Sequence, residues 1–188
     1  MAQLLFRLAL LLILLATGGF IVFIIKQQKP IFQWSNRILL TGFILHTLFL
    51  GHQFYTLGTA PVLNLKAALS FFSWTIIGAY LIFQIRFGLM VLGSFIAPFA
   101  AFLMIISSTM QGAEGFVRPL FRSTWFSVHV GTIFIGDGIF SVAFMAAIMY
   151  LIQERQIKRK KFGAFYSRLP SLETLDSINY YSLMVGFP

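Results

Sequence analysis

Three histidines and one aspartate lie inside long apolar stretches of this sequence, and they are the residues most able to do chemistry. His46 and His52 share one stretch, and His129 and Asp137 share a later one. An ionisable side chain at the centre of a membrane-spanning helix costs about 2.5–3.5 kcal/mol even on lenient insertion scales, so such residues usually have a function. These four side chains are therefore the first candidates for a functional site.

The absence of cysteine narrows the chemistry that the histidines can support. Without a thiol the chain can form no disulfide, no cysteine-ligated metal site and no covalent haem attachment. Three imidazoles suit a non-covalently bound haem b, and 23 phenylalanines offer apolar walls for a porphyrin. Zinc would need three or four ligands at one depth. The alternative is that these histidines only form hydrogen bonds between helices.

Depth along the expected helices separates the four candidates. His129 and His52 each lie about 7 Å inside the outer end of their spans. His46 lies about 9 Å deeper than His52, and Asp137 about 12 Å deeper than His129. Glycines flank Asp137 on both sides and allow another helix to approach, which favours an interhelical hydrogen bond of its carboxyl group. A proton relay, or a pairing with a mid-depth histidine such as His46, is the functional alternative.

The composition indicates that helices crossing a membrane position these residues. The chain of 188 residues is 59% hydrophobic and 10% charged, whereas soluble domains average about 45–50% apolar and 25% charged residues. We therefore expect an all-α, polytopic transmembrane helix bundle that forms one integral membrane domain over residues 1–188. Length and apolarity predict five spans and the start of a sixth, the five being residues 3–26, 37–57, 63–84, 87–108 and 124–152.

The basic residues predict how the bundle is oriented. The net charge is +9, and six of the fourteen lysines and arginines crowd the segment after the fifth span, namely Arg155, Lys158, Arg159, Lys160, Lys161 and Arg168. This placement is typical of a cytoplasmic loop that faces anionic lipid headgroups, not of a surface that binds nucleic acid. We expect the N-terminus outside, residues 153–170 in the cytoplasm, membrane lipids as partners and no nucleic acid.

The last segment, residues 169–188, combines a short amphipathic stretch with the start of a sixth span. Ser171 is placed to cap a helix in which Leu172, Leu175 and Ile178 share one face. The apolar run that begins at Ile178 is too short to cross a bilayer. We therefore expect the chain to be the N-terminal portion of a longer protein.

The order of several segments resembles a known family. The matching stretches are "LHTLFLGHQ", "PVLNLKAALSFFSW", "STWFSVHVGTIFIGDGIFSVAFMAAIMYLIQERQIKRKK" and "LPSLETLDSINYYSLMVGFP", which together cover most of residues 41–188. The third is the most specific, with its W-F-x-x-H-V start, a central G-D and a basic run after Y-L-I-Q-E. The sequence resembles the cytochrome c assembly proteins of the CcsA and CcmC type, and most closely their HemX-like branch.

This resemblance implies a multi-pass protein of the bacterial cytoplasmic membrane that binds haem and holds or delivers it at the outer face. His129 matches the outer-face haem ligand, with Trp125 in the same motif, and His46 matches the transmembrane ligand of a second haem position. His52 has no counterpart in the family and stays a weak candidate. The expected partners are haem, another assembly subunit and apocytochrome c, and the expected role is haem handling, not stand-alone catalysis.

Two departures from the family pattern leave other hypotheses open. The tryptophan-rich WWD segment is absent from this sequence, and so are the later helices that supply partner histidines. HemX-like members are also associated with haem biosynthesis, so a membrane regulator that acts through the basic cytoplasmic segment is the second hypothesis. A purely structural anchor subunit is the third.

Overall fold

Six helices form the regular structure of residues 2–58, 62–110, 123–160 and 168–187, the residues that the computed structural model describes. No strand occurs within those ranges, which confirms the all-α prediction. Lys161 of the predicted basic segment lies outside them. The helices are α1 (Ala2–Lys26), α2 (Lys29–Leu57), α3 (Leu65–Phe87), α4 (Gly93–Thr109), α5 (Thr124–Lys158) and α6 (Leu172–Gly186).

Four of these helices, α1, α2, α3 and α5, are long and apolar enough to cross a membrane. The fourth predicted span corresponds to α4, a shorter apolar helix of 17 residues. At about 1.5 Å per residue α4 is about 25 Å long, a little less than the hydrocarbon core of a bilayer. The chain is therefore a helical bundle of the kind that membrane proteins form.

The helix ends differ from the predicted spans for local reasons. α2 begins at Lys29, well before residue 37, because a proline in its first turn is compatible with helix and only Gln27 and Gln28 separate it from α1. α4 begins at Gly93, after the predicted residue 87, because Gly88 adopts a left-handed conformation (φ 65°) that ends α3. Ser171 caps α6 as predicted, accepting a hydrogen bond from the Thr174 amide at 3.2 Å.

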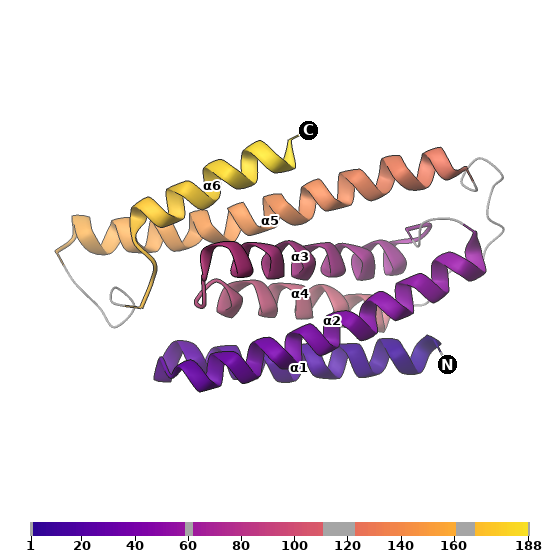
Figure 1. Ribbon diagram of the computed structural model, residues 1–188, viewed down its shortest axis with the longest axis horizontal. Helices are drawn as coiled ribbons and strands as arrows, with labels where there is room; N and C mark the ends of the chain where they lie inside the picture. The colour runs from indigo at the N-terminus through magenta and orange to yellow at the C-terminus, as the bar shows by residue number, and fades with distance from the viewer. Residues whose placement is uncertain (1, 59–61, 111–122, 161–167, 188) are drawn as a thin grey trace.

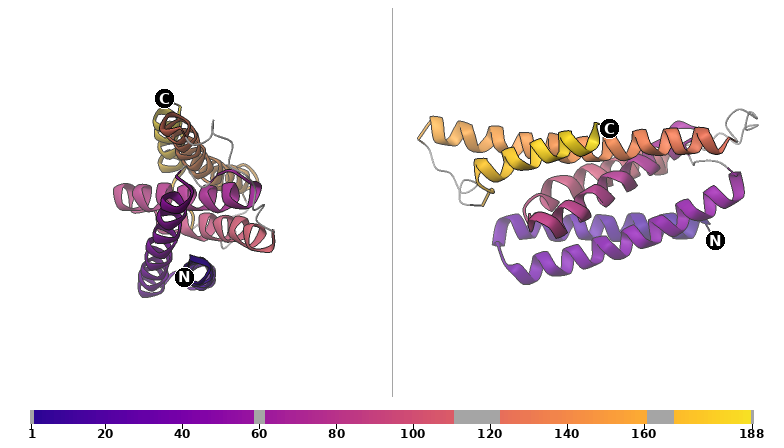
Figure 2. Two further views of the ribbon diagram at one scale, coloured as in Figure 1. Left: turned by 90° about the vertical axis from the view of Figure 1, so that its right-hand side faces the viewer. Right: turned by 45° about the horizontal axis from the view of Figure 1, so that its top comes forward.

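The helices pack as three successive pairs, α1 with α2, α3 with α4, and α5 with α6 (Figures 1 and 2). The α3–α4 pair is the middle layer, so α2 and α5 lie on opposite sides of α3. We call one end of the bundle the basic end, because Lys26, Lys29, Arg86 and Lys158 lie at its helix termini. The other end, where α2 finishes and α5 begins, is the histidine end.

Serine hydroxyls donate hydrogen bonds to backbone carbonyls of neighbouring helices and so join α1, α3 and α4. Three such bonds of 2.9–3.0 Å run from Ser73 to Ala100, from Ser107 to Lys66 and from Ser94 to Phe20. A polar bond between helices gains strength where neither water nor lipid can replace it. These bonds fix α4 against both α3 and α1, and so hold the middle layer that α5 rests on.

Glycines let α5 approach its neighbours closely. A Cβ atom on Gly138 would lie 2.8 Å from the carbonyl carbon of Thr75 in α3, and one on Gly136 would lie 2.9 Å from the carbonyl oxygen of Gly186 in α6. Both contacts are with backbone atoms, which cannot move aside as a flexible side chain can. The two glycines around the predicted mid-membrane aspartate thus set the position of α5 between α3 and α6.

Candidate functional site

His46 is fully buried where α1, α2 and α3 meet. Its Nε2 lies 2.9 Å from the Ser70 hydroxyl of α3, while its Nδ1 has no hydrogen-bond partner. The Phe6 ring of α1 meets the imidazole edge-on with centroids 6.3 Å apart, and the Phe49 ring lies 6.1 Å away. His46 of α2 is therefore joined to α3 by a hydrogen bond and to α1 by a ring contact, while Phe49 packs on it from its own helix.

This packing decides what His46 can bind. Its single unpaired nitrogen is an orphaned buried atom of the kind that a metal could use, but the side chain is completely covered by its neighbours. A porphyrin needs a broad apolar slot beside the ligating nitrogen, and a fully buried imidazole leaves no such slot open. As packed here, His46 fits the interhelical hydrogen bond expected of many membrane histidines, and it does not fit direct ligation of haem iron.

His129 has the opposite surroundings, because it is exposed in the first turns of α5. The helix begins at a cap in which the Ser123 hydroxyl accepts a hydrogen bond from the Trp125 amide at 3.2 Å. Trp125 is 81% exposed and lies four residues before His129, so both side chains point to the same side of the helix. Among the residues that the structure describes, none forms a hydrogen bond with the His129 imidazole. This open imidazole beside a large aromatic ring fits haem ligation.

His52 is also exposed at the histidine end, in the last turns of α2. Its carbonyl accepts a hydrogen bond from the Thr56 hydroxyl, and its imidazole forms no hydrogen bond with the residues that the structure describes. The structure gives no contact between His52 and His129, since α2 and α5 are on opposite sides of α3 (Figure 1). It therefore brings these two histidines to one end of the bundle without pairing them.

Asp137 is exposed on α5 at mid-depth. The adjacent Gly138 packs against Thr75, which is near the middle of the 23-residue α3. Among the residues that the structure describes, no donor or cation contacts the Asp137 carboxylate; only its backbone carbonyl is engaged, by the Ser141 hydroxyl at 2.8 Å. The close helix approach predicted from the flanking glycines is present. The interhelical hydrogen bond of the carboxyl group is not formed, and neither is a pairing with His46.

An aromatic row crosses the bundle at the level of Thr75, and it could be predicted only in part from the sequence. The indole of Trp74 stacks between the rings of Phe43 and Phe71, each 5.5 Å away, and donates a hydrogen bond to the Thr47 hydroxyl at 2.8 Å. Phe71 in turn meets Phe134 of α5 at 5.3 Å. The "SFFSW" run showed aromatic residues, but not that they join α2, α3 and α5.

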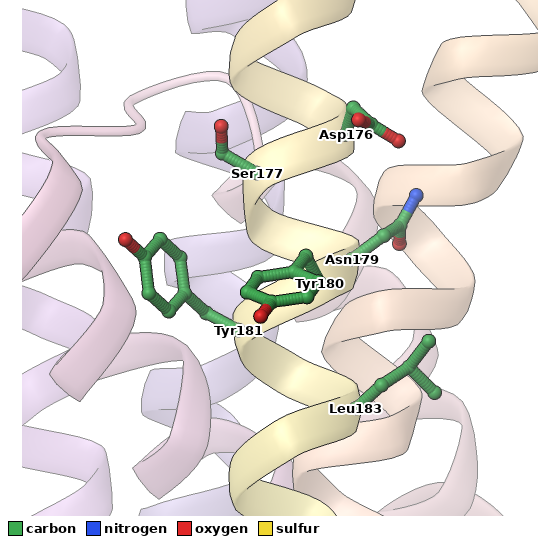
Figure 3. A pocket seen from close by; sticks show the side chains of 6 residues that line it. All are labelled: Asp176, Ser177, Asn179, Tyr180, Tyr181 and Leu183. Atoms are coloured by element: carbon green, nitrogen blue, oxygen red, sulfur yellow. The ribbon is translucent and has the colours of Figure 1, made fainter.

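A hollow of about 420 Å³ lies on α6, away from all four ionisable candidates (Figure 3). Its lining comes from this one helix and consists of Asp176, Ser177, Asn179, Tyr180, Tyr181 and Leu183. Figure 3 shows Tyr181 turned to one side of the helix and Asp176 and Asn179 to the other. Within the described ranges no group of three or more histidines and carboxylates could hold a metal ion. The hollow is therefore a feature of the α6 surface.

Comparison with known proteins identifies the family. The sequence model of the cytochrome C assembly protein family matches residues 62–188. The chain belongs to this family. The match includes Trp125, His129 and Asp137, whereas His46 and His52 precede it. It confirms the resemblance found in the sequence motifs.

Individual relatives point to the same family. Protein HemX of Bacillus subtilis (strain 168) is 28% identical over 166 residues, which cover 87% of this chain and 58% of the relative. The cytochrome c biogenesis protein CcsA of Guillardia theta is 24% identical over 185 residues, covering 88% of this chain and 61% of the relative. Protein HemX of Brevibacillus brevis is 26% identical, with 87% and 61% covered. The chain thus spans about three fifths of the length of these curated relatives.

Proposed function

We propose that this cytochrome c assembly family member holds haem b non-covalently at its histidine end, with His129 as an iron ligand. The observation that carries the proposal is the exposed His129, with Trp125 one turn earlier, in the part of the chain that matches the family. Neutral imidazole is a common axial ligand of haem iron, and an exposed aromatic ring offers an apolar face to a porphyrin. Both residues are on a helix whose start is fixed by the Ser123 cap.

The residues of the chain would bind and present haem, and would not catalyse a reaction on their own. Bound haem supplies the iron–porphyrin that a cytochrome assembly system needs. His129 would hold the iron through one nitrogen, while Trp125 would cover part of the porphyrin. His52, at the same end of the bundle, is the weaker candidate for a second ligand. His46 could ligate the haem iron only if α1, with Phe6, moved away from the imidazole.

The proposed location is the outer face of the bacterial cytoplasmic membrane. Lysines and arginines gather at the basic end, as expected for the cytoplasmic side of a multi-pass protein. The histidine end would then face outward, where haem could be passed to an apocytochrome or to another assembly subunit. Delivery of haem to an apocytochrome would suit a relative of CcsA, which is named a cytochrome c biogenesis protein.

An absorption spectrum tests the proposal directly. We expect the purified chain, supplied with haem in lipid nanodiscs, to give the Soret and visible absorption bands of histidine-ligated haem; sharp α and β bands on reduction would show in addition that a second axial ligand is bound. His129→Ala should weaken these bands strongly, whereas Ile135→Ala, an exposed residue on another face of α5, should leave them unchanged. Equal bands in the wild type and in His129→Ala would overturn the assignment of this ligand.

The second candidate function is regulation of haem biosynthesis through the basic segment at the end of α5. It is favoured by the names of the two HemX relatives, and by Arg159 and Lys160, which are exposed and form no ion pair in the described structure. Reversing the charge of Lys158, Arg159 and Lys160 should leave the Soret band intact under either function. If the reversal changes cellular haem levels while cytochrome c maturation continues, regulation is the better explanation.

A further inference from the structure

The basic end contains far more positive charge than its own acidic residues can balance. In the described part of the chain, its one ion pair joins Lys158 to Glu154 at 2.9 Å. The other cations at this end have no carboxylate partner among the described residues; they are Lys26, Lys29, Arg37, Arg86, Arg155, Arg159, Lys160 and Arg168. Arg37 and Arg86 lie over aromatic rings of their own helices, whereas Arg168 forms a hydrogen bond to a distant helix.

Arg168 lies in the segment before α6. Its Nη1 donates a hydrogen bond of 2.9 Å to the carbonyl of Ile24, a contact between residues 144 positions apart. The Gln27 side-chain amide donates to the same oxygen at 3.2 Å. Carbonyls in the last turn of a helix lack helical partners and are partly negative, so they hold a guanidinium well. Arg168 thus connects the start of α6 to the end of α1.

The guanidinium of Arg168 keeps most of its donors for another ligand. An arginine has five N–H donors, and the described structure uses one of them. Lys26 lies two residues beyond Ile24, and Lys29 follows the two-residue link to α2; both are exposed. A forked guanidinium beside two ammonium groups is a set of donors that matches the oxygens of a phosphate.

The apolar surface next to these donors favours the phosphate of a lipid over a soluble phosphate. Ile25 and Ile21 of α1 are 60% and 47% exposed and lead from Lys26 toward the middle of the span. Exposed apolar side chains directly under basic donors suit a molecule with an acidic headgroup and acyl chains. A soluble phosphate would gain nothing from this apolar surface.

We propose that Arg168, Lys26 and Lys29 bind the phosphate of an anionic phospholipid whose acyl chains lie along Ile21 and Ile25. The bound lipid would join the segment before α6 to the α1–α2 pair from outside, beside the Arg168–Ile24 hydrogen bond. This site is at the end of the bundle opposite His129, and it does not depend on haem binding.

Lipid titration of the full chain tests the site. We expect dioleoylphosphatidylglycerol to bind the detergent-purified protein, measured by native mass spectrometry, more tightly than dioleoylphosphatidylcholine. Each of Arg168→Gln and Lys26→Gln should weaken phosphatidylglycerol binding about fivefold. Arg7→Gln removes the same charge from an exposed residue near the N-terminus of α1, and Lys158→Gln removes a cation already paired with Glu154, so both should have little effect.

Three results would overturn the proposal. Equal weakening by Arg7→Gln would mean that net charge, and not a site, attracts the lipid. Displacement of phosphatidylglycerol by millimolar inorganic phosphate would mean that the acyl chains contribute nothing. Undiminished lipid binding by Lys26→Gln would mean that Lys26 does not bind the headgroup. Because Lys26 is exposed, this variant provides the test even if Arg168→Gln fails to fold.

Discussion

A histidine within a helix bundle can stabilise contacts between helices or can ligate a metal, and its packing decides which. His46 has one ring nitrogen on the Ser70 hydroxyl of α3 and the Phe6 ring of α1 edge-on beside it, so it stabilises the contact of α1, α2 and α3. His129 is exposed, beside Trp125, and both its ring nitrogens are open. From the sequence, both residues are histidines for which only a depth in the membrane could be predicted. Their surroundings could not be predicted, because they depend on side chains from other helices.

Asp137 provides a prediction at this scale, because the structure leaves its carboxyl group exposed and unpaired at the level of the middle of α3. Replacing it with leucine should raise the free energy of unfolding in a bilayer by about 2–3 kcal/mol, since a mid-membrane aspartate costs about that much to insert. Unfolding by titration with sodium dodecyl sulfate from lipid–detergent micelles would measure the change.

Ile133→Leu is the matched control for this prediction, because Ile133 is an exposed apolar residue of α5 and one turn away from Asp137. It should change the free energy of unfolding by less than about 0.5 kcal/mol. A loss of stability in Asp137→Leu would contradict the prediction and would indicate that the carboxyl group accepts a hydrogen bond in the assembled protein. Reduced haem loading without loss of stability would favour the proton-linked role.

The elements of the bundle are easier to predict than their contacts. Length and apolarity found every helix that the structure describes, and Ser171 marked the start of α6. The buried faces could not be predicted, because a helix in lipid can be apolar on all sides. In α1, for example, Ile13 is fully buried while Leu4 is 60% exposed, and hydropathy treats them alike.

Glycine contacts of α5 provide a prediction at the scale of elements. Gly138→Ala should lower the free energy of unfolding by about 1–3 kcal/mol, because the new Cβ would meet the backbone of Thr75 and push α3 and α5 apart. Gly131→Ala is the matched control in the same helix, since a Cβ there meets nothing within 4 Å. Alanine is a better helix former than glycine, so this control should be neutral or stabilising by up to about 1 kcal/mol.

The same titration with sodium dodecyl sulfate measures both alanine variants. Equal stability of Gly138→Ala and Gly131→Ala would contradict the close packing of α5 on α3. A matching loss of stability in both variants would instead mean that α5 needs glycine for its backbone conformation, which a regular helix does not.

At the scale of the whole molecule, the candidate site depends on how the bundle sits in the membrane. The sequence predicted that His52 and His129 lie near one end, and the structure has them at the same end, on α2 and α5. It did not predict that α3 separates these two helices, because the order of helices around a bundle follows from contacts between segments far apart in the chain. A site at this end therefore needs a ligand from His129 and a second contribution from elsewhere.

The orientation itself can be measured, and the absence of cysteine makes the measurement simple. Tyr55, at the end of α2, is 87% exposed, and Arg159 follows α5 at the basic end. A membrane-impermeant maleimide should label Tyr55→Cys in intact spheroplasts and Arg159→Cys only after permeabilisation, because basic residues stay on the cytoplasmic side. Ile44→Cys, in the middle of α2 and 51% exposed, should not react in either case.

The reverse labelling pattern would place the histidine end in the cytoplasm. His129 could then still ligate haem, and its absorption spectrum would be unchanged, but it could not present haem at the outer face. The basic end would also face away from the cytoplasm, which contradicts the distribution of lysine and arginine in multi-pass proteins. The labelling result therefore separates haem binding from haem delivery, two parts of the proposed function that the spectrum alone cannot distinguish.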